Sequence, residues 1–255
     1  MKLVQTPDDF QTRKKKYANG FMLGDVNMVL AFFKTDHAII KQILPPPLTP
    51  GPEPLGYAYV AEFQKTNFGI KYNEAALFIQ AQYKDEIGNY CLSMPVDNDI
   101  AMAAGREVYG YPKKIADAIT LTRQGNHVKG TCIRRGIPII EITADIQAPF
   151  PEKFTGTPDF VLKAFPSLDA IGVDDHPRLI RHNSKVDYGP IEIGSGTLTL
   201  QKSHKDLLHE IPVNEVTMAA YTTYTTIWMQ PATLLEELKP QDCHPYFYIK
   251  YDQDM

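Results

Sequence analysis

Two adjacent lysines, Lys113 and Lys114, follow a proline in the segment GREVYGYPKKIA (residues 105–116). Lysine pairs are usually solvated, but tyrosines and an isoleucine that can exclude water flank this one. A free lysine amine has a pKa of about 10.4, so at neutral pH it is protonated and cannot attack a carbonyl. Burial disfavours the ammonium form, and a second cation nearby disfavours it further. The segment therefore has the residue types of a nucleophilic lysine with a neighbour that tunes it.

The elements before the pair restrict the backbone that leads into it. Residues 97–110 have Asp and Asn at their start and an Ala/Met-rich body, which predicts a helix. Gly110 suits the C-terminal cap, and Pro112 cannot continue a helix and keeps Tyr111 extended. Adjacent side chains diverge in helices and strands, so Lys113 and Lys114 need not touch, and Lys114 can pair with a carboxylate such as that of Glu62.

Two other helices are predicted. Residues 35–44 place isoleucines and a leucine on one face, with Asp36 as the expected capping side chain and prolines directly after. Residues 231–239 carry Pro231 where a first helical turn tolerates it.

The remainder of the chain has mostly strand patterns. Residues 75–83 and 90–94 are typical of a hairpin, with the expected turn at Gly88-Asn89. Short turns favour antiparallel pairing. We therefore predict a single domain over residues 1–255 with a mainly β (α+β) fold, a closed or cone-like antiparallel barrel with a few short helices. Further strands are expected as a three-strand meander over 118–146 and at 196–201 and 215–229.

The composition limits the class of protein. The 255 residues hold 26 basic and 30 acidic side chains, a net charge of -4, which gives no electrostatic case for nucleic acid. The basic run Arg13 to Lys16 is expected to be a solvated face. The N-terminus has no apolar signal core and the chain has no apolar run that could span a membrane, so a cytoplasmic protein is expected.

Other chemistries find no support. The three cysteines are far apart and odd in number, so neither a disulfide framework nor a CxxC site is predicted. No HExxH, Walker or GxSxG motif occurs, and the GSG at 194–196 lies among strand formers with no helix after it. No metal and no cofactor are predicted.

The lysine segment resembles the active-site motif of the acetoacetate decarboxylase family, in which Gly-Arg-Glu is followed after four residues by Pro-Lys-Lys. The resemblance continues along most of the chain. It covers FFKTDHAIIKQILPPPL (32–48), AEFQ (61–64), YNEAALFI (72–79), FVLKAFP (160–166) and IPVNEV (211–216).

This resemblance implies roles for individual residues. Lys113 would form a Schiff base with the substrate, and Lys114 would be the second lysine that helps to lower its pKa. Glu74 and Glu62 would be the two acidic residues of the pocket. Less certain roles in substrate binding fall to Arg106, beside Glu107, and to Met94, which follows the predicted hairpin. The family fold is a β-rich, cone-like barrel that typically forms homo-oligomers.

The sequence departs from the family at one position. Family decarboxylases carry an arginine in the strand before the Thr-Asp segment, thought to engage the substrate carboxylate, and Val26 stands there in this chain. Arg106, Lys34 and Asn27 are the candidates to replace it.

Three functions remain open. The resemblance implies decarboxylation of a β-keto acid, most simply acetoacetate to acetone and carbon dioxide. Because the family arginine is missing, a second hypothesis is another Schiff-base lyase, an aldolase-dehydratase acting on pyruvate and an aldehyde. The third hypothesis is a barrel that binds an apolar ligand without catalysis. The expected partner is a small keto acid, with no nucleic acid or membrane.

Overall fold

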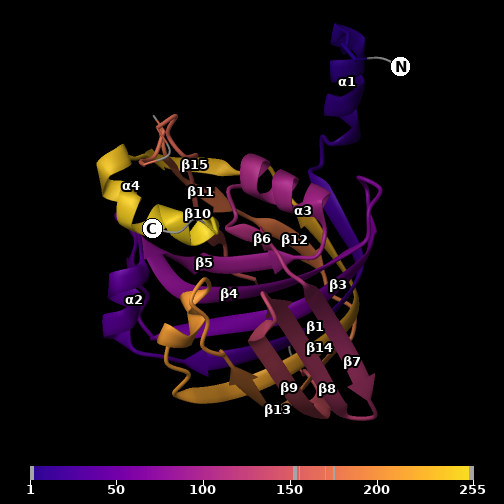
Figure 1. Cartoon of the computed structure of the whole chain (residues 1–255). Coiled ribbons are helices and arrows are strands. Elements are labelled where there is room, and N and C mark those ends of the chain that lie inside the picture. The colour runs from indigo at the N-terminus through magenta and orange to yellow at the C-terminus, as the bar shows by residue number, and fades with distance from the viewer. Residues whose placement is uncertain (1–2, 152–153, 155, 170, 175, 253–255) are drawn as a thin grey trace.

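The computed structural model describes residues 3–151, 154, 156–169, 171–174 and 176–252 (Figure 1). Most of the described chain forms one 15-stranded sheet, with short helices along its borders. The predicted mainly β fold with few short helices is confirmed.

The first half of the chain contributes the central strands. These are β1 (Phe21–Lys34), β2 (Thr49–Pro50), β3 (Leu55–Thr66), β4 (Tyr72–Tyr83), β5 (Glu86–Val96) and β6 (Lys113–Ile115). The second half adds β7 (Ala118–Gln124), β8 (His127–Arg134), β9 (Ile137–Pro149), β10 (Asp159–Lys163), β11 (Arg178–His182), β12 (Ser184–Asp187), β13 (Ile191–Thr199), β14 (Glu215–Met229) and β15 (Thr233–Glu237). The meander predicted over 118–146 and the strand predicted at 215–229 are confirmed.

The strands pair in the order β15-β11-β10-β5-β4-β3-β1-β14-β13-β9-β8-β7, with β12 on β14, β2 on β4 and β6 on β5. The β5–β10 and β5–β6 pairs are parallel, and the other pairs are antiparallel. Within the described residues, β15 and β7 end this order, so the hydrogen-bonded sheet does not close into the barrel that the sequence suggested. Instead the sheet curves until β7–β9 lie across β1 and β3: a Cβ on Gly130 of β8 would lie 2.6 Å from the Val60 side chain of β3.

The helices are α1 (Pro7–Lys16), α2 (His37–Ile43), α3 (Asp99–Ala103), the π-helix η1 (Ala104–Val108), the 3-10 helix η2 (Leu207–Glu210), α4 (Pro240–Phe247) and the 3-10 helix η3 (Tyr248–Lys250). In place of the helix predicted at 231–239 the chain forms β15, which pairs with β11, and α4 begins only at Pro240. Pairing with β11 overrides the local helical pattern there.

Two local predictions were wrong in detail. The β4–β5 hairpin turns at Lys84-Asp85. Gly88 lies inside β5, where an added Cβ would be 2.6 Å from the carbonyl oxygen of Pro158, just before β10. Asp36 occupies the N-cap position of α2 but makes no capping hydrogen bond. Its carboxylate instead accepts a hydrogen bond from the Asn214 side chain at 2.7 Å.

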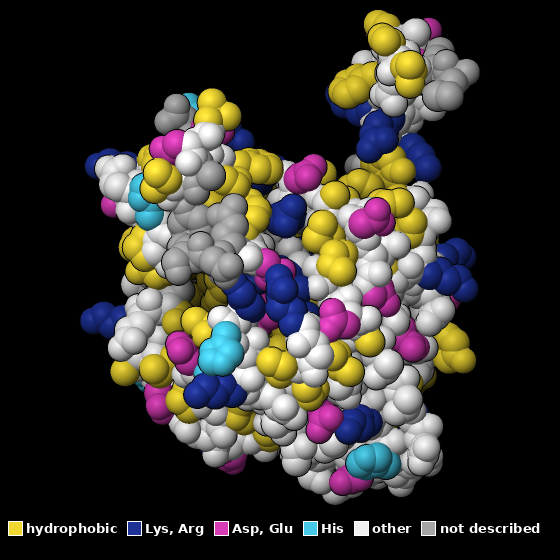
Figure 2. All heavy atoms as spheres, viewed as in Figure 1, with side chains coloured by type: hydrophobic (Ala, Val, Ile, Leu, Met, Phe, Trp, Pro, Cys, Tyr) yellow, Lys and Arg dark blue, Asp and Glu magenta, His cyan; other side chains and the backbone are white. Residues whose placement is uncertain are grey.

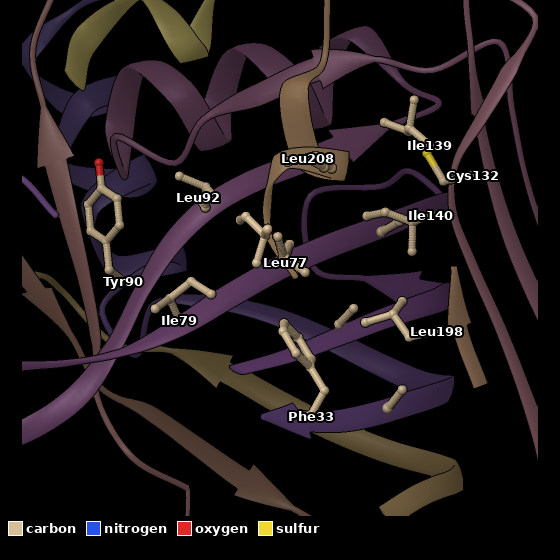
Figure 3. Close-up of a cluster of buried hydrophobic side chains, with 14 of the residues drawn as sticks. Phe33, Leu77, Ile79, Tyr90, Leu92, Cys132, Ile139, Ile140, Leu198 and Leu208 are labelled. Carbon is tan, nitrogen blue, oxygen red and sulfur yellow. The ribbon is translucent and has the colours of Figure 1, made fainter. Parts of the chain in front are cut away.

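Alternation along the central strands gives the sheet two apolar faces. On β1, Val29, Ala31 and Phe33 point to a core that β7–β9 and α2 cover; we call it the inner core (Figure 3). Met28 belongs to a second cluster on the opposite face, which we call the cavity face. Because the central strands are buried on both sides, a shift of one residue moves a side chain from one environment to the other.

The N-terminal helix α1 stands away from the body of the protein (Figure 2). It buries none of its residues, and the basic run Arg13 to Lys16 forms its exposed last turn, which confirms the expectation of a solvated face. Among the described helices, none has the length and apolar character to cross a membrane.

Candidate active site

A cavity of about 480 Å³ opens on the cavity face, between the central strands, α3 and the β10–β12 side of the molecule. Its walls are mostly aromatic and aliphatic. Carboxylate, imidazole and amine groups reach it from four of its lining residues: Glu74, Lys113, Asp159 and His182. Within the described part of the chain, no group of three or more His, Cys, Asp or Glu residues is arranged to hold a metal ion.

Lys113 enters the cavity from β6. This short strand pairs in parallel with β5, which sets Lys113 beside Met94, another cavity residue. The side chain is only 6% exposed, and its amine lies 5.3 Å from the centre of the Tyr72 ring. It passes directly over Gly105 of the π-helix, where a Cβ would overlap the lysine methylenes. Glycine in the Gly-Arg-Glu motif therefore makes the space through which the lysine reaches the cavity.

Glu74 on β4 receives the amine of Lys113. One carboxylate oxygen accepts a hydrogen bond from that amine, and the other accepts one from the Tyr59 hydroxyl. Glu74 is 4% exposed, so both bonds lie away from water. Burial and the Glu74 charge raise the pKa of Tyr59 well above its usual range, which keeps it a hydrogen-bond donor. The three side chains form a linked proton-carrying group in an apolar cavity.

The other predicted glutamate lies on the opposite face of the sheet. Ala61 on β3 is paired with Glu74, so Ala61 shares the cavity face and its neighbour Glu62 does not. Glu62 lies near the side-chain amides of Asn27 and Gln64, both at 3.5 Å. The structure therefore separates the two glutamates that the sequence suggested for one pocket.

Lys114 also points away from the cavity. It pairs with Pro95 on β5 while Lys113 pairs with Met94, so the two side chains leave opposite faces of β6. Its amine lies 3.1 Å from Asp206 and 3.5 Å from Asp252, which take the place of the suggested Glu62 partner. The two lysine side chains therefore share no face on which direct contact could tune either amine.

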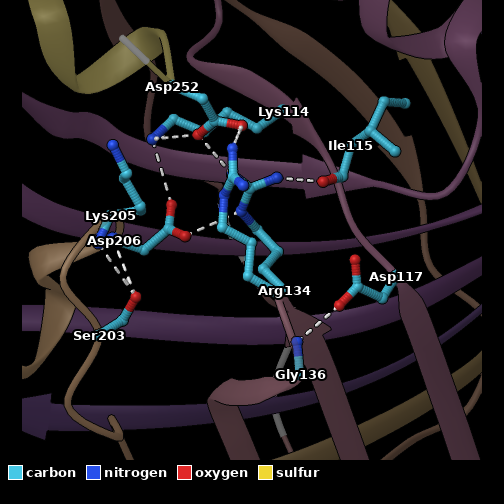
Figure 4. Close-up of polar contacts among 10 residues, drawn as sticks. Lys114, Ile115, Asp117, Arg134, Gly136, Ser203, Lys205, Asp206 and Asp252 are labelled. Atoms are coloured by element: carbon cyan, nitrogen blue, oxygen red, sulfur yellow. Dashed lines mark hydrogen bonds and ion pairs between the residues drawn. The ribbon is translucent and has the colours of Figure 1, made fainter. Parts of the chain in front are cut away.

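Lys114 belongs to a buried ion cluster, which we define as Lys114, Arg134, Asp206 and Asp252 (Figure 4). Arg134 is 2.9 Å from Asp206 and 2.6 Å from Asp252. Burial by itself raises the pKa of Asp252, but the hydrogen bond and charge of Arg134, with Lys114 and Arg135, hold it below its usual value. The cluster ties β6, β8, the segment before η2 and the C-terminal segment together behind the cavity.

Other predicted site residues lie outside the cavity lining. Arg106 places its guanidinium 5.1 Å from the Tyr251 ring, and Glu107 is exposed. Lys34 pairs with Glu215 at the surface. Val26 is fully buried in the cavity-face cluster. None of the three candidate replacements for the family arginine, Arg106, Lys34 and Asn27, lines the cavity.

One wall of the cavity carries polar residues that were not predicted from the sequence. Asp159 at the start of β10 accepts a hydrogen bond from the Tyr111 hydroxyl at 2.9 Å, and burial raises its pKa to about 7 despite that bond. His182 stacks on the Tyr111 ring at 5.1 Å, and its Nε2 lies 2.8 Å from the Tyr109 carbonyl. Burial lowers the pKa of His182 to about 4. Asp159 directly precedes the segment FVLK, but no local pattern links it to residues 109–113.

A third buried lysine, Lys250, also lies outside the cavity lining. Burial lowers the pKa of Lys250 to about 7, yet its amine donates hydrogen bonds to the carbonyls of Gly110 and Leu162. It therefore serves as an internal comparison for Lys113: both amines are buried, but only Lys113 lines the cavity.

The fold and site define a mainly β protein with a lysine–glutamate pair buried in an apolar cavity. The model of the family described as "Acetoacetate decarboxylase (ADC)" matches residues 6–238, and the chain belongs to this family. A curated acetoacetate decarboxylase from Burkholderia ambifaria (strain MC40-6) is 29% identical over 150 residues, which span 57% of this chain and 60% of that protein.

Solved structures share the fold. Acetoacetate decarboxylase from Legionella pneumophila superposes with a TM-score of 0.78 at 20% identity, covering 85% of this chain and 87% of that one. The enduracididine biosynthesis enzyme MppR, complexed with the condensation product of pyruvate and imidazole 4-carboxaldehyde, gives a TM-score of 0.74 at 20% identity, over 85% of this chain and 89% of that one. This fold is therefore shared by an acetoacetate decarboxylase and by an enduracididine biosynthesis enzyme.

Proposed function

We propose that the protein decarboxylates a β-keto acid through a Schiff base on Lys113. The observation that carries this proposal is the Lys113 amine, which is buried in an apolar cavity and bonded to Glu74. The acetoacetate decarboxylase relatives support the reaction class, and acetoacetate is the simplest substrate of that class.

The reaction needs Lys113 as a neutral amine. Glu74 takes the proton from the ammonium, and the amine nitrogen bonds to the ketone carbon of the substrate. Loss of water then leaves an iminium whose nitrogen is β to the carboxylate. When the carbon–carbon bond to the carboxylate breaks, its electron pair moves toward the iminium nitrogen, carbon dioxide leaves and a neutral enamine forms. Protonation at carbon and hydrolysis release the ketone and restore Lys113.

The surroundings favour these steps in two ways. An apolar cavity disfavours the ammonium of Lys113 and the carboxylate of the substrate, whereas the enamine and carbon dioxide are uncharged. Tyr59 holds an exchangeable proton and Glu74 can accept one beside the amine, which places them to carry protons to and from the intermediate.

Reductive trapping tests the proposal. Incubation with acetoacetate and borohydride, followed by peptide mapping, is expected to modify Lys113, and Lys113→Arg is expected to remove the adduct because a guanidinium cannot form the imine. Adduct on Lys250 or Lys114 at similar yield would contradict the assignment. Carbon dioxide release identifies decarboxylation, whereas trapping of pyruvate at Lys113 without any release would point to the aldolase-dehydratase.

A further inference from the structure

The cavity is much larger than acetoacetate requires. Its volume of about 480 Å³ lies in the range, roughly 300–1,000 Å³, of pockets that enclose drug-sized ligands. The Lys113–Glu74 pair occupies one part of it, so the remaining space has no role in a reaction on a small keto acid alone.

Strand register shows where this space extends. Glu74 is level with Ala61 on β3, whereas Phe78, four residues further along β4, is level with Tyr57 and, beyond it, with Phe32 on β1. At the usual strand rise, four residues correspond to about 13 Å. All three rings line the same cavity, which therefore continues along the sheet away from the amine.

The walls of this extension are apolar and rigid. We call it the distal arm and define it by Phe32, Tyr57, Phe78 and Met218. Tyr57 stacks on Phe78 at 4.8 Å and lies 5.8 Å from Phe32, and Met218 on β14 is paired with Phe32. These side chains stand on paired strands of one sheet, so the distal arm is formed without movement of a loop.

None of the four residues that define the distal arm is charged, although Asp159 is close enough to Tyr57 to help burial raise the pKa of its hydroxyl. The carboxylate, amine and imidazole groups of the described lining belong to Glu74, Lys113, Asp159 and His182. No arginine of the described chain lines the cavity to hold a carboxylate. Binding energy for the substrate must therefore come largely from apolar contacts.

We propose that the substrate is a β-keto acid with a long alkyl or aryl substituent on its keto carbon, and that this substituent lies in the distal arm. The inference rests on the proposed function, because it places the ketone carbon at Lys113. The apolar substituent takes over the positioning that a carboxylate-binding cation would otherwise supply.

A chain-length series tests this inference. Carbon dioxide release is measured for acetoacetate and for homologues with progressively longer alkyl chains on the keto carbon. Each methylene buried in the distal arm is expected to raise kcat/KM by up to about fourfold, until the arm is full. A kcat/KM that stays level or falls as the chain lengthens would overturn the inference.

Two matched variants locate the effect. Met218→Trp is expected to fill part of the distal arm and to lower the ratio of kcat/KM for a long acid to that for acetoacetate by at least about tenfold. Thr217→Trp adds the same side chain at the exposed neighbouring position, which lies outside the cavity lining, and is expected to leave the ratio unchanged. An unchanged ratio in Met218→Trp would contradict occupation of the arm.

Borohydride trapping distinguishes a failure of the distal-arm inference from a failure of the proposed function. Adducts at Lys113 with acetoacetate and with the long acids, together with a level chain-length series, would overturn the distal-arm inference and leave the proposed function standing. Absence of any adduct at Lys113 would overturn the proposed function and this inference with it.

Discussion

Lys113 and Lys114 are neighbours of the same type, each 6% exposed, but they lie in different surroundings. Lys113 faces the cavity and meets one carboxylate, that of Glu74. Lys114 faces the ion cluster, where two aspartates and an arginine surround it. Burial alone therefore does not distinguish the proposed nucleophile from a lysine held in an ion cluster. The number of charges that compensate the amine, and access to a cavity, separate them.

The carboxylates on the two sides differ in the same way. In the ion cluster, partial desolvation would raise the pKa of the more exposed Asp252, but Arg134 and Lys114 lower it below its usual value. On the cavity wall, Asp159 has a tyrosine for a partner, and burial raises its pKa to about 7. Behind β6 two cations face two carboxylates, whereas on the cavity wall Asp159 is bonded to a tyrosine and His182 to a backbone carbonyl.

The largest expected effect comes from exchanging each lysine for arginine. Lys113→Arg is expected to abolish turnover, because the guanidinium stays charged and forms no imine. Lys114→Arg keeps a cation between Asp206 and Asp252 and is expected to retain activity within about tenfold. Steady-state carbon dioxide release measures both, with circular dichroism as the control for folding. Equal loss in the two variants would remove the distinction between them.

Breaking the ion cluster is expected to cost stability. Asp206→Asn leaves the charges of Lys114 and Arg134 poorly compensated and is expected to lower the free energy of unfolding by about 3–5 kcal/mol. Urea denaturation measures this. Glu215→Gln removes the partner of Lys34 in an exposed pair and is the matched control, with a much smaller expected cost because water screens the pair. Similar small losses in both would show that the buried cluster contributes little.

The cavity wall predicts opposed pH effects on stability. Asp159 binds its proton up to about pH 7 when folded but has an ordinary value of 3.8, so its contribution to stability is present at low pH and is lost as pH rises from about 4 to 7. His182 titrates at about 4 instead of 6.5, so its contribution is present above pH 6.5 and is lost as pH falls toward 4. In the wild type these two effects largely cancel.

The variant Asp159→Asn should remove the pH effect of Asp159 and leave that of His182. Its free energy of unfolding, relative to that of the wild type, is expected to rise by roughly 3–5 kcal/mol between pH 4 and pH 7.5, since each pKa unit corresponds to about 1.4 kcal/mol. Urea denaturation across this range measures the difference. Asp145→Asn, at an exposed carboxylate, provides the control. A pH-independent difference for Asp159→Asn would show that Asp159 is ionised in the folded protein.

Gly105 tests how closely the lysine must be placed. An added Cβ in Gly105→Ala would overlap the Lys113 side chain and push its amine away from Glu74. We expect kcat to fall by up to about 100-fold, as a displacement of about 1 Å can cause, with little change in urea stability. Gly125→Ala, where the added carbon has open space but φ is +61°, is a control for activity only, at a glycine outside the site. Full activity in Gly105→Ala would show that this contact does not position the amine.

The smallest effect is expected from direct electrostatic tuning. Lys114→Ala should move the acid limb of the pH–rate profile by less than about half a pH unit, because Lys114 faces away from Lys113 and its charge is matched by two aspartates. An upward shift of about one unit would restore Lys114 to the tuning role that the family resemblance implies.

Local patterns determined much of the architecture. The β14 strand at 215–229, the meander over 118–146 and the helical segment before Gly110 follow from residue type and turn residues. The helix predicted at 231–239 and the turn predicted at Gly88-Asn89 were wrong because contacts with distant segments set the local structure. Residues 233–237 form a strand because they pair with β11. Gly88 lies inside a strand, where the Pro158 carbonyl packs too closely for a side chain.

For the site, Lys113 as the candidate nucleophile and Glu74 as an acidic residue of the pocket could be named from the sequence, through a resemblance carried by several short segments along most of the chain. Only the tertiary structure decided which side chains share a face. Register along β3, β4 and β6 placed Glu62 and Lys114 behind the sheet. Pairing of β10 with β5 and with β11 brought Asp159 and His182 to the cavity wall. Successive side chains of a strand point to opposite faces of the sheet. In a sheet that is buried on both faces, a shift of one residue therefore moves a side chain from the apolar cavity to the ion cluster. Pairing between strands that are distant in the sequence sets this register.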